Sequence, residues 1–316
     1  MILFGLLAGA SLAVGCGAAG YLWYRRTSSL PSEKKGPPVP GLSDVLPSGH
    51  ILSSFNYEHR HERDYGLSYI SQKSCYSYQD VPLDYVGDVV AACFDVFDER
   101  YYSKKKAQES SLSDAEIREL WHAENEEAQR VGAFMHRQLN NMLLDKYYQF
   151  SMTYSYVGEY TKVSKMISIV DEANQFNEFL KENELRPYRS MWVIYDEVSG
   201  LVGTIDLLAL NAAGQHVMFN WTRSHTLGEE TADGFLVNNE SYGCTGKGAF
   251  RHVPDSPFHR EALQMSVLRL ILLQKYGIDV VSAQTAVFHS DNMKYHLIDL
   301  PFMRDEAENL LSRPIK

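Results

Sequence analysis

The chain has little of what metal-binding or disulfide-stabilised folds require. Its 316 residues include only four cysteines, Cys16, Cys75, Cys93 and Cys244, far apart and without CxxC or Cys/His finger spacing. Neither a structural zinc site nor a disulfide framework is indicated, and we expect reduced thiols. Basic residues are also in the minority, because the net charge is −10. This acidity disfavours broad, sequence-independent binding of nucleic-acid backbones, which needs Lys and Arg to replace condensed counterions.

A long uncharged run occurs only at the N-terminus. The 23 residues from Ile2 to Tyr24 carry no charge and are followed by Arg25 and Arg26. As a helix they rise roughly 34 Å, enough to cross a bilayer core. We predict a transmembrane signal anchor over residues 1–26 rather than a cleaved signal peptide, because no basic residue precedes the run. A lipoprotein signal at Cys16 is an alternative that lacks the same basic start.

The charges that follow this run predict its orientation. By the positive-inside rule the N-terminus lies outside and the large domain is cytosolic. A moderately apolar anchor followed by basic residues is similar to those of the mitochondrial outer membrane, which we favour; bacterial inner-membrane and other organelle anchors are similar too. Gly5, Gly9, Ala13 and Gly17 recur every fourth residue. They predict a stripe for packing against another transmembrane helix, although small residues are common in such helices.

Residues 27–50 have the composition of a linker. They contain Pro31, Pro37, Pro38, Pro40 and Pro47 among Ser, Gly and Lys, which predicts an extended tether. We expect folded structure from Ile51 onward. With no internal repeat and no second break, residues 51–316 are predicted to form one domain.

The periodicity of this domain predicts alternating helices and strands. Ser113 and Glu116 have capping-box spacing at the start of a helix that runs to about Lys146. Asn211–Gly214 supplies turn chemistry for a hairpin. Other predicted helices cover 171–182, 257–276 and a segment from 304; predicted strands cover 191–195, 201–210, 216–222, 280–289 and 295–300. This order predicts an α/β fold with a mixed sheet flanked by helices.

Several short motifs follow one another in an order typical of one nuclease family. Gly203-Thr204-Ile205-Asp206, and then Asn220-Trp221-Thr222 at the end of the next strand, resemble the GxxD and (D/E)xK motifs of PD-(D/E)XK (restriction-endonuclease-like) nucleases. His136 ends a stretch that resembles the GxxxH motif of the RecB/Cas4-like members, and Gln264 resembles the Gln of their QxxxY motif. The resemblance covers about 112–311 and looks most like mitochondrial genome maintenance exonucleases and nucleases of large DNA viruses.

Most of the positions that would perform cleavage are substituted. In the family two acids hold Mg²⁺ and the Lys orients the attacking water. Here the second acid is Asn220, the Lys is Thr222, and the acid that usually follows the motif His is Asn140. The resemblance leaves only Asp206 and His136 as metal ligands. We therefore expect no cofactor, with Mg²⁺ only if metal binding is retained.

Ordinary structural roles also explain the retained residues. Asp206 is equally consistent with a polar end of a buried strand, His136 with a satisfied core histidine, and Gln264 with a helix-to-loop hydrogen bond. Replacements for the lost groups are few. Arg223 is one residue out of phase with the site, Lys247 and Arg251 lie in an insertion, and Glu229 and Glu230 lie in a segment that we predict to be too irregular to fix a ligand.

These observations predict a membrane-anchored, catalytically inactive nuclease-like protein. It would act as a scaffold or interaction subunit with protein partners, in organelle membrane or organelle-DNA maintenance, since a fold does not by itself retain an activity. Two alternatives stay open: a Mg²⁺-dependent DNA exonuclease with displaced catalytic residues, and a non-catalytic nucleic-acid binder. The net charge disfavours nucleic acid as a partner.

Overall fold

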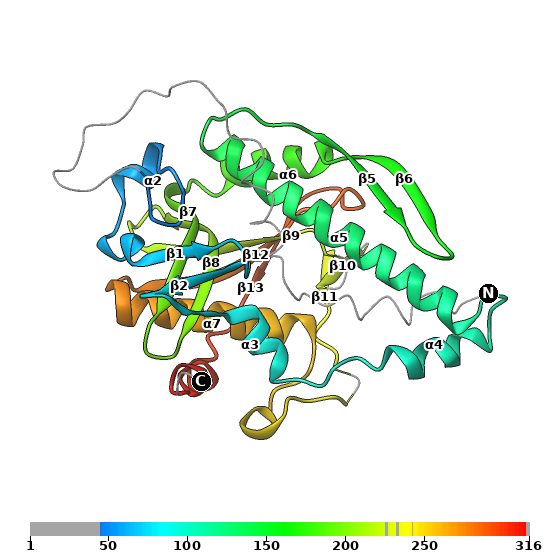
Figure 1. The fold of residues 1–316 in the computed structure, drawn as a ribbon. Coiled ribbons are helices and arrows are strands. Elements are labelled where there is room, and N and C mark those ends of the chain that lie inside the picture. Colours follow the sequence, from blue (N-terminus) through cyan, green and yellow to red (C-terminus); the bar gives the residue numbers. More distant parts are fainter. Residues whose placement is uncertain (1–44, 225–226, 232–233, 242, 314–316) are drawn as a thin grey trace.

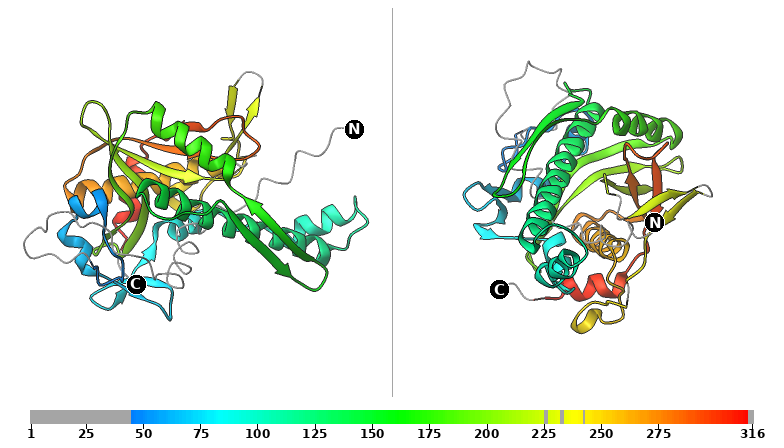
Figure 2. Two further views of the ribbon diagram at one scale, coloured as in Figure 1. Left: turned by 90° about the horizontal axis from the view of Figure 1, so that it is seen from above. Right: turned by 90° about the vertical axis from the view of Figure 1, so that its right-hand side faces the viewer.

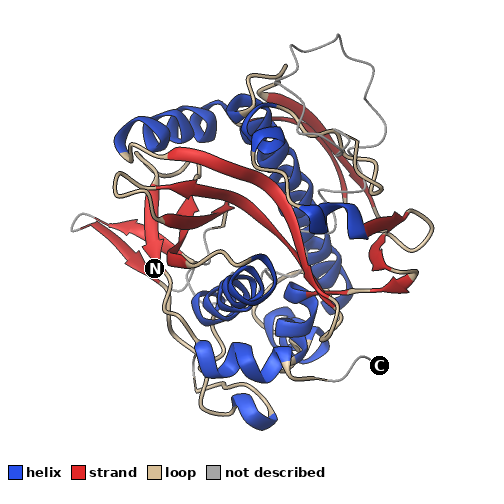
Figure 3. Ribbon diagram, turned by 90° about the vertical axis from the view of Figure 1, so that its left-hand side faces the viewer, coloured by secondary structure: helices blue, strands red, loops and turns tan. Residues whose placement is uncertain are grey.

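The elements form three layers, with a mixed sheet between two layers of helices (Figures 1 and 3). The computed structural model describes residues 45–224, 227–231, 234–241 and 243–313. The N-terminal part contains α2 (Ser54–Glu58), the 3-10 helix η2 (Glu62–Gly66), β1 (Leu67–Ile70), β2 (Cys75–Tyr78), β3 (Val81–Pro82), β4 (Asp84–Tyr85), α3 (Val86–Ala92) and α4 (Glu99–Ala107).

The rest of the chain supplies the long helices and most of the main sheet. The elements in order are α5 (Asp114–Leu143), β5 (Ser151–Val157), β6 (Lys162–Ser168), α6 (Val170–Glu182), β7 (Arg186–Asp196), β8 (Leu201–Leu210), β9 (His216–Thr222), β10 (Gly228–Thr231), β11 (Gly234–Val237), η3 (Gly248–Phe250), α7 (Pro257–Tyr276), β12 (Val280–Val287), β13 (His296–Asp299) and α8 (Arg304–Leu311). This confirms an α/β fold with a mixed sheet flanked by helices.

The main sheet has the order β13-β12-β9-β8-β4, and β7 pairs with the other edge of β8. The β9–β12 and β4–β8 pairs are parallel, and the remaining pairs are antiparallel. The predicted hairpin joins β8 and β9: Asn211 Oδ1 accepts hydrogen bonds from the backbone of Ala213 and Gln215, and Gly214 has a φ of 75°. The turn therefore sets the register of the two central strands.

Each face of the sheet is covered by its own helices. On one face α7 and α8 pack in a core with Ile205, Leu208 and Met218. On the other face α5 and α6 enclose an aromatic core that includes Trp221 and Phe288. α7 begins at the Ser256 N-cap and ends at Gly277 with φ 66°, as its sequence predicts. The sheet is therefore buried on both sides, which explains its nearly continuous apolar strands.

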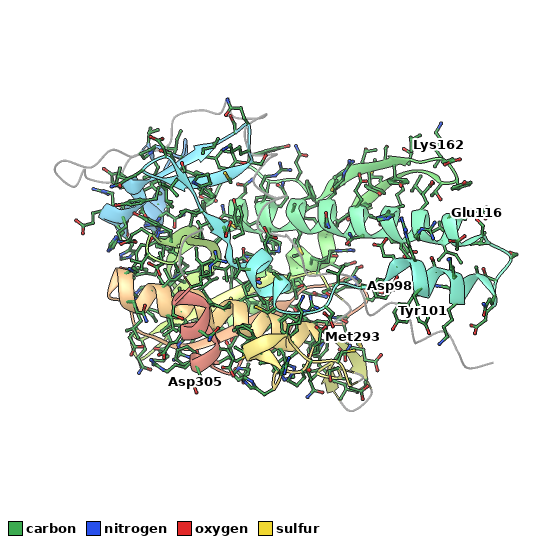
Figure 4. All side chains as sticks on the ribbon, turned by 60° about the horizontal axis from the view of Figure 1, so that its bottom comes forward. Asp98, Tyr101, Glu116, Lys162, Met293 and Asp305 are labelled. Atoms are coloured by element: carbon green, nitrogen blue, oxygen red, sulfur yellow. The ribbon has the colours of Figure 1, made fainter. Side chains whose placement is uncertain are left out.

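Part of the helical layer extends past the sheet as an arm. α5 has 30 residues, about 45 Å of helix, and its N-terminal half leaves the body together with α4 and the β5–β6 hairpin (Figure 2). Figure 4 shows Tyr101, Glu116 and Lys162 toward the far end of this arm. The buried Tyr154 hydroxyl donates to the Ala123 carbonyl at 2.8 Å and ties the hairpin to α5.

Some predicted boundaries differ from the structure. β7 begins at Arg186, five residues before the predicted strand. The segment of Glu229 and Glu230 was predicted to be too irregular to fix a ligand, yet both residues lie in β10, which pairs antiparallel with β11. The predicted anchor 1–26, with its Gly5, Gly9, Ala13 and Gly17 stripe, lies outside the described residues. Within the part of the chain that is described, no helix is long and apolar enough to cross a membrane.

Candidate functional site

The two central strands separate at the positions that carry the motifs. β8 pairs with β7 along nearly its whole length. On its other edge β4 reaches only Leu201 and Val202, and β9 reaches only Leu207–Leu210. The segment Gly203–Asp206 has no paired strand on this edge among the described strands, while β9 continues beside β12 to Thr222. The sheet thus forks between Asp206 and Asn220.

The strand is irregular at the fork. Met191 lies opposite Asp206, between the Ser190–Leu207 and Trp192–Ile205 pairs, and has a φ of 45°. A left-handed conformation is uncommon for a non-glycine residue inside a strand. Ile205 packs in the core beside α7 and Leu207 in the core beside α5, although residues two apart normally share a face. Asp206 therefore stands where the side-chain alternation of β8 breaks.

Asp206 and His136 form a buried pair between the sheet and α5. His136 Nδ1 lies 3.1 Å from Asp206 Oδ1, and Asp206 Oδ2 accepts the backbone N–H of Trp221 at 2.8 Å. Burial lowers the pKa of His136, but the charge and hydrogen bond of Asp206, with a bond to the Trp221 backbone, outweigh it and raise the pKa overall. Both carboxylate oxygens of Asp206 are thus used by the protein.

A second carboxyl group enters from α7. Asn220 Nδ2 donates to Glu261 Oε1 at 2.5 Å, and the Thr285 hydroxyl donates to the same oxygen at 3.3 Å. Burial raises the pKa of Glu261, and the negative charge of Asp206 raises it further, against the opposing effects of the Asn220 and Thr285 hydrogen bonds and the His136 charge. Asn220 thus donates to a buried carboxyl group whose pKa is raised above its ordinary value.

The other motif positions lie around the same fork. Asn140 Oδ1 accepts the Ser190 hydroxyl at 2.7 Å, in a network that continues to Asn56. Gln264 lies against the first turn of α3, since its Oε1 is 3.1 Å from where a Cβ on Gly87 would stand. No hydrogen bond of the Gln264 side chain joins it to a described residue, so the predicted helix-to-loop bond is not found.

All six motif positions line one cavity of about 200 Å³, enough for roughly six waters. They are His136, Asn140, Asp206, Asn220, Thr222 and Gln264. The cavity also contains Lys146 and Arg189, and the Arg189 guanidinium is held by Asp64 at 2.7 Å. Sequence reasoning missed Glu261 and Lys146. Glu261 has one signal, because it precedes Gln264 by three residues and so shares its helix face.

The other candidate replacements lie elsewhere. Arg223 Nε donates to the buried Glu172 of α6 at 2.6 Å, on the face away from α7. Lys247 Nζ is 3.8 Å from Asp95, and Glu230 accepts the Met293 N–H at 2.7 Å. None of these residues, nor Arg251 or Glu229, lines the cavity.

The donor set does not fit Mg²⁺. This ion requires oxygen ligands in near-octahedral geometry, usually from ionised carboxylates. The Asp206 oxygens are both engaged, His136 is paired with one of them, and Glu261 Oε1 already accepts from Asn220 and Thr285. Among the described residues no three His, Cys, Asp or Glu side chains are grouped so that they could hold a metal ion.

Comparison with known proteins adds no family to these observations. The sequence matches no protein-family model, and no curated protein is significantly similar to it.

Proposed function

We propose that this chain is a catalytically inactive relative of the PD-(D/E)XK nucleases that acts as a membrane-anchored scaffold or interaction subunit. One observation carries the proposal. The positions that resemble the nuclease motifs meet at one cavity, but their polar atoms bind one another, His136 to Asp206 and Asn220 to Glu261. A carboxylate that pairs with a histidine, beside a carboxyl group that accepts from an amide, has little affinity left for a divalent cation.

The proposed location and partners of the protein rest on its sequence. The uncharged run at 2–24 would place the domain on the cytosolic side of a membrane, with the mitochondrial outer membrane favoured. Protein partners would then carry the function, in organelle membrane or organelle-DNA maintenance. The net charge of −10 supports protein rather than nucleic acid as the main partner.

The test is calorimetric titration of the full chain with Mg²⁺ and Mn²⁺, followed by a nuclease assay on single-stranded DNA. The proposal predicts neither binding heat nor cleavage, and a stable protein partner on pull-down. Cleavage that is lost in Asp206→Ala would overturn it. DNA binding that weakens steeply with salt, without cleavage, would instead support a non-catalytic nucleic-acid binder.

The second candidate is a Mg²⁺-dependent DNA exonuclease with displaced catalytic residues. The presence of Glu261 and Lys146 in the cavity favours it, because they bring back one carboxyl and one amine to a site that lost both at Asn220 and Thr222. Under this candidate Glu261→Gln and Lys146→Met would each abolish cleavage. Glu229→Gln is the matched control, since Glu229 is exposed and lies outside the cavity.

A further inference from the structure

The segment Val45–Leu52, here called the strap, forms part of the wall of the cavity. Five of its residues line the cavity: Leu46, Ser48, His50, Ile51 and Leu52. The strap lies within and just beyond the predicted linker 27–50, so the last part of that linker lies against the domain. Part of the cavity wall is thus formed by the residues that connect the domain to the preceding chain.

Three backbone contacts link residues of the strap to one another. Val45 and Ile51 form an isolated antiparallel bridge, the Leu46 N–H donates to the His50 carbonyl at 2.7 Å, and the Gly49 N–H donates to the Leu46 carbonyl at 2.8 Å. Gly49 makes the turn with a φ of 85°. These backbone contacts lie within the turn, which belongs to neither the main sheet nor a helix.

The C-terminal end of the strap has a firm hinge. Asn56 of α2 exchanges hydrogen bonds with Ser190 of β7, and Arg189 donates to the His59 carbonyl at 2.9 Å. α2 is therefore fixed to the sheet, whereas Val45 and Ile51 are 49% and 59% exposed. This contrast between a firm attachment and an exposed turn is typical of a segment that moves as a lid.

The strap contributes two leucines and a histidine to the lining of the cavity. Leu46 and Leu52 contribute aliphatic side chains to the lining, and burial lowers the pKa of His50 to about 4, so its imidazole is neutral at pH 7. We propose that Val45–Leu52 is a displaceable strap that closes the fork cavity in cis, so that the position of the preceding chain controls access to it. This inference holds whether or not the cavity is catalytic.

A thiol placed inside the cavity can report its opening. Thr204 lines the cavity, and its buried hydroxyl has no hydrogen-bond partner, so Thr204→Cys leaves no group unsatisfied. The full chain would be treated with N-ethylmaleimide and the peptide that contains position 204 quantified by mass spectrometry. Labelling is expected to be at least about tenfold faster when Leu46→Ser and Leu52→Ser are added, because both remove apolar contacts of the strap.

Two controls separate strap release from general loosening. Val45→Ser lies in the same turn, outside the cavity lining, and is expected to leave the labelling rate unchanged. Native Cys93, half-buried between α3 and α4, is expected to react at its normal rate. Equal rates at position 204 with and without the leucine substitutions would overturn the proposal, as would a matching acceleration at Cys93.

A peptide that restores closure gives an independent test. A synthetic peptide with the sequence of residues 44–53, added to the protein that carries Thr204→Cys, Leu46→Ser and Leu52→Ser, is expected to slow the labelling again. A peptide of the same composition in scrambled order is expected to have no effect. Failure of the native peptide to protect position 204 at millimolar concentration would show that the strap does not bind the mouth as proposed.

Discussion

At the level of residues, the Asp206 carboxylate joins three parts of the protein. It accepts from His136 of α5 and from the Trp221 backbone of β9 while belonging to β8. Each bond satisfies a group that the fork would leave unpaired. The role of Asp206 in the structure is therefore to close the open end of the fork.

Removal of this carboxylate is expected to destabilise the fold. Asp206→Ala leaves His136 and the Trp221 N–H buried without a partner and should lower the free energy of unfolding by about 2–4 kcal/mol. Urea unfolding of the two proteins measures the difference. Asp305→Ala, at the exposed start of α8 (Figure 4), should stay within about 0.5 kcal/mol of the parent protein. An unchanged midpoint for Asp206→Ala would contradict the closing role.

Glu261 makes stability depend on pH in a defined direction. The pKa of the Glu261 carboxyl group is raised above 4.5 in the fold. Its contribution to the free energy of unfolding is therefore fully present below pH 4.5 and is lost as pH rises from 4.5 through the folded pKa. Glu261→Gln keeps an oxygen acceptor for Asn220 and removes the charge. The stability of Glu261→Gln relative to the parent should therefore be higher at pH 8 than at pH 4.5. Urea titrations at both pH values test this; a constant difference would rule it out.

The motif residues could be predicted from sequence because their order along the chain carries the information. His136, Asp206, Asn220 and Gln264 come from α5, β8, β9 and α7, and all four line the same cavity. The partner of Asn220 could not be predicted in the same way. In the sequence, Glu261 is one more polar position of α7. Only the packing of that helix on the sheet brings Glu261 to the fork.

At the level of elements, local signals fixed the boundaries that were predicted correctly. Ser113 and Glu116 form both bonds of the capping box, Gly277 ends α7, and the turn after Leu210 ends β8. β5 and β6 carry no comparable signal, because most of their side chains are exposed and the hairpin packs mainly on α5 of the arm. β7 was predicted too short since the irregularity at Met191 interrupts its alternating pattern.

The left-handed backbone of Met191 provides a test of this irregularity. Glycine adopts positive φ without strain, so Met191→Gly should recover the roughly 1–3 kcal/mol stored there and offset the loss of its side chain. Met166→Gly, in regular strand β6 and 77% exposed, should cost about 1 kcal/mol. Thermal unfolding compares the two variants. The strain argument fails if the half-buried position loses more stability than the exposed one.

At the level of the whole molecule, the sequence predicts a domain tied to a membrane by its N-terminus. We expect the full chain to stay in the membrane fraction after alkaline extraction. Val14→Lys places a charge near the middle of the uncharged run, at a cost of about 2.5–3.5 kcal/mol, and should move the protein to the soluble fraction. Ser29→Lys, after the two arginines, is the matched control. If both variants stayed in the membrane fraction, this result would argue against a spanning helix.

The fold class follows from composition and periodicity, whereas the arrangement of the arm and the strap does not. Alternating helices and strands permit only a layered α/β architecture. Residues 45–50 of the strap fall in the predicted linker 27–50, whose prolines among Ser, Gly and Lys predict an extended tether, whereas they form a turn that lines the cavity. Proline and glycine report local conformation, but not whether a turn is bound.

The fork also allows side chains of the site to change without a change in the sheet. Gly203–Asp206 depends on β7 alone for its strand pairing, so changes on the open edge break no ladder between β8 and β9. A lineage can therefore exchange acids and amines around the fork and keep the same sheet. Such a domain can lose one chemistry and gain another by drift at a few positions, while selection on its packing continues unchanged.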